Sequence, residues 1–106
     1  MVIEWLKFKV KPELREKFIK EDAEIWTAFL TRRDGHLGKE VWINPEKDDE
    51  VVAISRWQTL EQWKSIPENL LKETEEKFSE SMGKDSYELI EAGQYQIRKF
   101  IDNSKT

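Results

Sequence analysis

Three side chains of this chain could take part in acid–base or anion chemistry. His36 is the only histidine, and a single imidazole can act as a general base or as an axial haem ligand near neutral pH. It lies at the entrance of an expected strand, where an ordinary turn residue would fit equally well. Arg56 and Arg98 carry the planar guanidinium that suits carboxylates and phenolates. A carboxylate of the same chain, Glu40 or Glu4, is the alternative partner for these arginines.

The five tryptophans could line a pocket for a flat aromatic ligand, through ring stacking and indole N–H hydrogen bonds. Tryptophan also fills the cores and interfaces of small domains. Trp26 and Trp63 lie on the apolar stripes of expected helices, which favours packing. Trp5 and Trp42 have polar neighbours along their strands and are therefore the better candidates for a ligand pocket.

Several kinds of site are excluded by composition. The chain has no cysteine, so thiolate catalysis, disulfides and cysteine metal clusters are ruled out. The single histidine and the absence of a recognisable Asp/Glu spacing argue against a metal site. The glycines are too few and misplaced for a phosphate loop, and no serine lies in a nucleophile elbow. We expect no metal and no cofactor.

Charge and hydropathy exclude two kinds of partner. The net charge is −4, and lysines and arginines are interleaved with acidic residues, so the basic patch that binds nucleic acid is missing. No apolar run approaches the ~18 residues of a membrane span, and the N-terminus lacks the order of a signal peptide. These features predict a cytoplasmic protein that binds neither nucleic acid nor membrane.

Hydrophobic periodicity predicts the order of the elements. Alternating residues indicate strands at 2–10, 36–43, 50–58 and 87–100. Helical spacing indicates a helix at about 12–33, a short one at 59–65 opened by a Thr59/Gln62 capping box, and a longer one from 67 that ends at Gly83. The order β-α-β-β-α-β predicts an α+β, ferredoxin-like protomer with a four-stranded antiparallel sheet. We expect one domain at 1–101 and a polar tail at 102–106.

In this arrangement both helices cover one face of the sheet, and the second face lies open. If the more apolar side of each strand faces the helices, the open face carries a mixed aromatic and charged set: Trp5, Lys7, Glu40, Trp42, Val52, Ile54, Arg56, Gln94, Gln96 and Arg98. The same face of a second chain is its simplest cover. We expect a homodimer closed through the sheets, with an ion pair between Glu40 and Arg56 inside it.

Three segments resemble a known family: Val10-Lys11-Pro12 at the end of the first strand, DGHLGK at 34–39, and ISRWQTLEQW at 54–63. They are similar to dimeric α+β barrel proteins, most of all to the antibiotic biosynthesis monooxygenase-like group and, in detail, to a small set of uncharacterised cyanobacterial proteins. The resemblance covers nearly the whole chain. It implies a ferredoxin-like protomer, a dimer closed through the sheets, and a cavity between sheet and helices or at the interface.

That superfamily includes cofactor-free monooxygenases of aromatic polyketides or quinols, haem-degrading enzymes, isomerases and proteins with no known activity. Many members carry a histidine in the short helix after the third strand, nine residues beyond the aromatic residue that ends it. Counted from Trp57, this place is Ile66 here, so the imidazole that would bind haem or move a proton is missing.

The sequence thus predicts a ligand pocket made by Trp5, His36, Glu40, Trp42, Arg56 and Arg98. The expected function is binding of a small aromatic or apolar ligand, with cofactor-free monooxygenase-like activity, although no catalytic residue is assigned. The alternative is a non-catalytic, stress-related or structural dimer whose sheet face is used up by assembly. A third interpretation is haem binding through His36.

Overall fold

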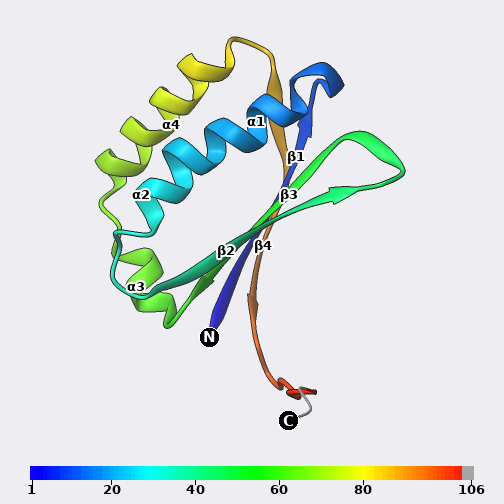
Figure 1. The fold of residues 1–106 in the computed structure, drawn as a ribbon. Coiled ribbons are helices and arrows are strands. Elements are labelled where there is room, and N and C mark those ends of the chain that lie inside the picture. Colours follow the sequence, from blue (N-terminus) through cyan, green and yellow to red (C-terminus); the bar gives the residue numbers. More distant parts are fainter. Residues whose placement is uncertain (104–106) are drawn as a thin grey trace.

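The computed structural model describes residues 1–103, which form a four-stranded antiparallel sheet with helices packed on one of its faces (Figure 1). The strands are β1 (Val2–Val10), β2 (His36–Asn44), β3 (Lys47–Trp57) and β4 (Tyr87–Gln96). Their order across the sheet is β2-β3-β1-β4. Helices follow β1 and β3, so the α+β, ferredoxin-like arrangement predicted from the sequence is confirmed.

The helix predicted at 12–33 consists of four consecutive segments. A 3-10 turn (Pro12–Leu14) leads into α1 (Arg15–Asp22), a π-helical stretch (Ala23–Thr27) and α2 (Ala28–Leu30). The helix therefore ends three residues early. Two hydrogen bonds of the tighter 3-10 type close its end: Arg32 N–H donates to the Phe29 carbonyl at 3.3 Å, and Arg33 N–H donates to the Leu30 carbonyl at 2.9 Å.

The second helical region follows the prediction closely. Gln62 N–H donates to Thr59 Oγ1 at 3.1 Å at the start of α3 (Leu60–Lys64), and the Thr59 hydroxyl donates to Gln62 Oε1 at the same distance. The longer helix α4 (Glu68–Met82) ends before Gly83, whose φ of +93° suits glycine. Within residues 1–103, no helix is long and apolar enough to cross a membrane.

The strand boundaries differ from the prediction mainly at the β2–β3 connection, predicted at 44–49, and at the end of β4. The connection between β2 and β3 is only Pro45–Glu46, because Asn44 Oδ1 accepts a hydrogen bond from Glu46 N–H at 2.9 Å and tightens the turn. Strand β4 stops at Gln96 instead of residue 100. Its one neighbour, β1, begins at Val2, so beyond a last bond from Ile97 N–H to the Met1 carbonyl no backbone remains to pair with. Residues 102 and 103 have no regular structure, and the rest of the predicted tail, 104–106, lies outside the described residues.

The core lies between the sheet and the helices in two clusters. One is built on Phe18, which packs against Phe78 at 5.1 Å between ring centroids and against Val51 of β3. The other is built on the fully buried Trp57 with Leu30 and Ile66. Trp26, in the π-helical stretch, packs against both clusters and so lies where they meet.

Candidate functional site

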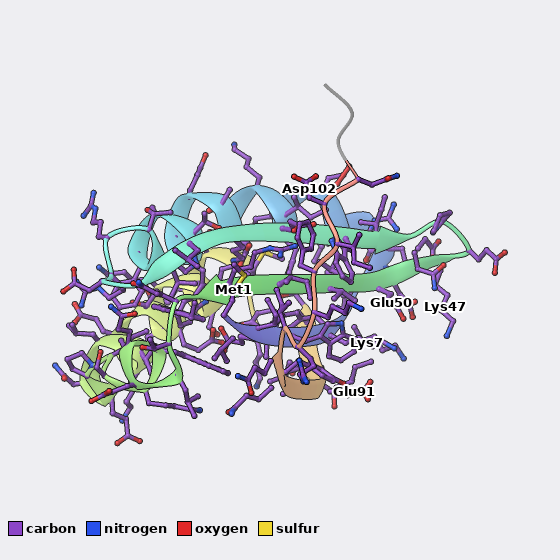
Figure 2. All side chains as sticks on the ribbon, turned by 90° about the horizontal axis from the view of Figure 1, so that it is seen from below. Met1, Lys7, Lys47, Glu50, Glu91 and Asp102 are labelled. Atoms are coloured by element: carbon purple, nitrogen blue, oxygen red, sulfur yellow. The ribbon has the colours of Figure 1, made fainter. Side chains whose placement is uncertain are left out.

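The register of the strands decides which side chains face the helices and which lie on the open face. On the open face, Trp5 of β1 lies opposite Ile54, and on β2 Glu40 and Trp42 lie opposite Ile54 and Val52. These residues are on the face expected from the sequence. Farther along it, Lys7 lies between Glu50 and Glu91, at 3.6 and 3.9 Å (Figure 2).

The predicted contact between Glu40 and Arg56 is confirmed. Arg56 Nε donates to Glu40 Oε2 at 3.2 Å, and a second guanidinium nitrogen donates to the same oxygen. The indole N–H of Trp42 donates to the other oxygen at 3.2 Å. The Arg56 hydrogen bond, followed by that of Trp42, lowers the pKa of the Glu40 carboxyl. In the single chain the pair is accessible to solvent, with side chains 36% and 46% exposed.

His36 lies on the helix side of the sheet, away from the other members of the predicted pocket. The register shifts between His36 and Gly38, so that Leu37 is an extra residue and His36 pairs with Trp57. Its ring meets the Trp57 ring edge-on at 4.9 Å, and its Nε2 is buried without a hydrogen-bond partner in the described chain. Burial, and then the charge of Lys39, lower the His36 pKa, so the imidazole is held neutral.

The positions predicted for the last strand were wrong. Gln94 and Gln96 pair with Glu4 and Val2 and therefore belong to the helix side, whereas Tyr95, 60% exposed, lies opposite Ile3 on the open face. Ile90 forms a bulge, because Leu89 pairs with Phe8 and Glu91 pairs with Lys7. This bulge reverses the alternation within β4, so the residues that face the helices are odd-numbered before it and even-numbered after it. Arg98 lies beyond the end of β4 and is exposed, outside the sheet pattern used to place it.

A cavity of about 630 Å³ lies between the sheet and the helices. Aromatic and aliphatic side chains form about half of its lining, and polar or charged side chains form most of the rest. The lining includes Glu4, Phe8, Asp22, Trp26, Lys39, Ser55, Trp63, Ile66, Glu75 and Tyr87. Of the six residues predicted to form a pocket, none lines this cavity. Their role as ligand contacts stays a prediction for the open face.

A row of polar side chains crosses the sheet at this cavity. Ser55 of β3 pairs with Glu4 of β1 on one side and with Lys39 of β2 on the other, and Glu4 pairs in turn with Gln94 of β4. Directly opposed residues share a face about 4.5–5.5 Å apart, so these four side chains lie side by side. On one side of the row, Leu6 and Ala53 pair with each other. The floor of the cavity is therefore apolar with a single polar line across it.

The cationic end of this row is held by a buried ion pair. Lys39 Nζ lies 2.6 Å from Asp22 Oδ2 at the end of α1, with side chains only 6% and 9% exposed. A lysine ammonium has three donors, of which this hydrogen bond uses one. The pair therefore fixes a positive charge at the wall of the cavity.

The anionic member, Glu4, has no such partner. Its side chain is half-buried, and in the described part of the chain no hydrogen bond or ion pair reaches its carboxyl group. Burial raises the pKa of Glu4, with Lys39 and then Lys64 acting in the opposite direction. A half-buried carboxyl group that lines a cavity and has a raised pKa is a candidate for proton exchange with a ligand.

A second polar group lies at the side of the cavity formed by α4 and β4. The Tyr87 hydroxyl donates to Glu75 Oε2 at 2.6 Å, and the Trp26 indole N–H donates to Glu75 Oε1 at 3.2 Å. Burial, and then Glu75, strongly raise the Tyr87 pKa, so the hydroxyl stays protonated. Trp26 reaches this position from the π-helical stretch, a local widening that is frequent at functional sites.

The sequence contained signs of this cavity. Glu4 lies on the apolar side of β1, among Val2, Leu6 and Phe8, and Asp22 lies between Ile19 and Trp26 on the apolar stripe of the first helix. A charged residue on a buried face needs a partner or a function. Trp26 and Trp63, interpreted as packing residues, line the cavity as well. Ile66, at the place of the missing histidine, is buried and also lines it.

The residues present do not form a metal centre. Among the described residues, no group of three or more His, Asp or Glu side chains is placed to hold a metal ion. The chemistry that this arrangement can perform with its own groups is proton transfer by Glu4 and binding of an oxyanion by Lys39.

Comparison with known proteins points to one family. A family model described as antibiotic biosynthesis monooxygenase matches residues 1–66. No curated protein sequence matches the chain. Among solved structures, the chain is similar to SnoaB, a cofactor-independent oxygenase from Streptomyces nogalater, with 18% identity over 94% of this chain and 95% of that one and a TM-score of 0.71.

Two further structures share the fold. The monooxygenase from the gene ActVA-Orf6 of Streptomyces coelicolor, in complex with nanaomycin D, has 16% identity over 97% of this chain and 92% of that one, with a TM-score of 0.75. A conserved protein from Methanosarcina mazei Go1 has 20% identity over 90% of both chains and a TM-score of 0.66. At such identities the likeness establishes the fold.

Proposed function

Since the chain belongs to the antibiotic biosynthesis monooxygenase family, we propose that it binds a small, flat, hydroxylated aromatic compound between its sheet and helices and oxygenates it without a cofactor. The observation that carries this proposal is the cavity of about 630 Å³ with its single polar row. Sites for small molecules measure about 300–1,000 Å³ and combine apolar walls with a few polar groups that fix orientation.

The wall of the cavity suits a flat ring system. Trp26, Trp63 and Phe8 offer aromatic surfaces, and an aromatic ligand gains from stacked or edge-on contacts with them. The polar row supplies the groups that would meet a ring hydroxyl.

The reaction needs no metal or flavin if the ligand itself reduces oxygen. A phenol that has lost its proton is electron-rich and can transfer an electron to O₂ directly. For an anthrone, the ring CH₂ group and one O₂ give a C=O group and one water, so both oxygen atoms are accounted for. The relatives support this reaction class, because SnoaB is described as a cofactor-independent oxygenase and ActVA-Orf6 as a monooxygenase whose structure contains nanaomycin D.

The open face supports a homodimer as the working assembly. Trp42 and Tyr95 are 47% and 60% exposed there, an unusual position for two large aromatic side chains. We place a second copy on this face, with the Glu40–Arg56 pair inside the interface. The finer likeness to cyanobacterial relatives and the cytoplasmic location stay predictions.

The proposal is tested by titrating the protein with an anthrone under nitrogen while following tryptophan fluorescence, and then admitting oxygen and measuring its uptake. Binding should quench the tryptophan fluorescence of the wild-type protein. The quenching should be smaller in Trp63→Phe, which removes one indole from the cavity. The matched variant Trp42→Phe removes an indole from the open face and should keep the full change. If the wild type gives neither quenching nor oxygen uptake above the uncatalysed rate, the proposal fails.

The second candidate is a non-catalytic dimer, favoured by the exposed aromatic side chains of the open face. It predicts a dimer in sedimentation experiments together with no binding of any hydroxylated aromatic compound. A dimer that does bind and oxygenate the anthrone excludes it.

A further inference from the structure

The polar row at the floor of the cavity has a division of charge that suggests a specific chemical step. Its members lie in sheet order Lys39, Ser55, Glu4 and Gln94, all on the helix side. Only the lysine has its charge balanced by a close partner, Asp22 at 2.6 Å. The carboxyl group of Glu4 is left facing the cavity without a hydrogen bond from the described residues.

We propose that Glu4 and Lys39 together form a proton-transfer site, in which Glu4 accepts the proton of a phenolic or enolic hydroxyl and Lys39 binds the resulting oxyanion. This assignment rests on the proposed function for placing the ligand in the cavity. In the step, the O–H bond of the ligand breaks, the proton moves to a carboxylate oxygen of Glu4, and the electron pair stays on the ligand oxygen. No oxidant or reductant takes part.

Geometry gives each residue its part. A ligand hydroxyl group placed over Ser55 would lie between the side chains of Glu4 and Lys39, since Ser55 pairs with both residues. Asp22 holds the ammonium in place and leaves other N–H donors for an anion. A carboxylate without a partner at an apolar cavity is poorly solvated, which costs free energy. Accepting a proton from the ligand neutralises the carboxylate and removes this desolvation penalty.

The charges around Glu4 come from every element that packs there. Lys39 lies on β2, Lys64 on α3, the Asp22 carboxylate at the end of α1, and the bonded pair of Glu75 and Tyr87 on α4 and β4. Glu75 already accepts two hydrogen bonds, and Asp22 is paired with Lys39. Asp85 and Glu88 also line the cavity, but both are exposed, whereas Glu4 is half-buried. Glu4 is therefore the half-buried carboxylate of this cavity that is left to take a proton.

The assignment makes a thermodynamic prediction that does not depend on turnover. If Glu4 holds the ligand's proton, then binding of a ligand that is already an anion requires Glu4 to take a proton from solvent. Lawsone, 2-hydroxy-1,4-naphthoquinone, is such an anion at neutral pH, and 1,4-naphthoquinone is its neutral counterpart without the hydroxyl group. Wild-type affinity for lawsone should fall by up to about tenfold per pH unit as Glu4 ionises, whereas affinity for naphthoquinone should stay constant.

Calorimetric titrations of both quinones between about pH 6 and pH 8 test this prediction. In Glu4→Gln the amide cannot ionise, and the affinity for lawsone should lose its pH dependence. Glu76→Gln is the matched control, because Glu76 is an exposed carboxylate of α4 outside the cavity, and it should keep the wild-type slope. The double variant Asp22→Ala/Lys39→Met, which removes the whole ion pair, should lower the affinity for lawsone at least tenfold more than the affinity for naphthoquinone.

Two results would overturn the assignment alone: wild-type affinity for lawsone that does not vary with pH, or a slope in Glu4→Gln equal to that of the wild type. If neither quinone binds the wild-type protein, the proposed function fails together with the assignment. Should Glu4→Gln fail to fold, NMR titration of the glutamate carboxyls in the wild-type protein replaces it. Lawsone should then raise the pKa of a single buried glutamate, and an unchanged set of titration curves would refute the proposal.

Discussion

Breaking the buried ion pair of the cavity should be among the most damaging single changes in this chain. The side chain of Lys39 is only 6% exposed, and Asp22→Ala removes the one ion-pair partner that it has among residues 1–103. Removing one partner of a buried pair costs about 3–5 kcal/mol. A domain of this size has a total stability of roughly 5–15 kcal/mol, so a fifth or more of it would be lost. At roughly 4 °C per kcal/mol, the Tm should fall by about 12–20 °C.

Urea unfolding followed by circular dichroism measures this loss, and two further variants interpret it. Glu73→Ala breaks the exposed pair with Lys77, 4.0 Å long with side chains 59% and 68% exposed, and should cost about 0.5 kcal/mol or less. Adding Lys39→Met to Asp22→Ala removes the stranded charge and should recover about 2 kcal/mol or more. The single variant Lys39→Met completes the cycle. If the loss in the double variant equals the sum of the losses in Asp22→Ala and Lys39→Met, the two residues are not coupled and the reasoning is refuted.

Three other changes have defined outcomes. Glu4→Gln should raise the free energy of unfolding near pH 8 but not near pH 4. The pKa of Glu4 is raised in the folded state, so the wild-type protein loses stability as pH rises through that pKa and the carboxyl group ionises, whereas the amide does not ionise. Equal shifts of the urea midpoint at both pH values would contradict this. Gly35→Ala should cost about 1–3 kcal/mol in thermal unfolding, since φ is +86° and the new Cβ would lie 2.3 Å from Gln62 Oε1; an unchanged Tm would show that this backbone is free to adjust. Arg56→Met should change the stability of the isolated protomer little, because the ion pair of Arg56 with Glu40 is exposed there. The same change should weaken the dimer in sedimentation experiments. A dimer that is unchanged or stronger would show that the ion pair is not needed.

The fold was predictable because local patterns carry it. Alternation, the Thr59 cap and the glycine after α4 gave the element order and most boundaries without any knowledge of packing. The same patterns misplaced residues wherever the register slips. The extra residue at Leu37 turns His36 toward the helices, and the bulge in β4 does the same for Gln94, since one inserted residue reverses every side chain beyond it.

The candidate site was predictable only in part, for a related reason. The residues that stand out in the sequence, such as the lone histidine and the strand tryptophans, predicted a pocket on the open face. Glu4 and Asp22 are ordinary acidic residues in a chain with 22 of them. What makes them distinctive is their place at one cavity: Asp22 is paired with Lys39, and Ser55 alone separates Glu4 from Lys39 in the sheet.

The sequence by itself therefore determined the β-α-β-β-α-β order, the cross-strand contact of Glu40 with Arg56 and the two-sided character of the sheet. These follow from periodicity and from pairing between adjacent strands, which are local properties of the chain. Tertiary structure alone decided that a cavity exists on the helix side and that Glu4, Ser55 and Lys39 form one row across it. Such a row depends on the register of three strands, and register is fixed only when the whole sheet and the helices above it are packed together.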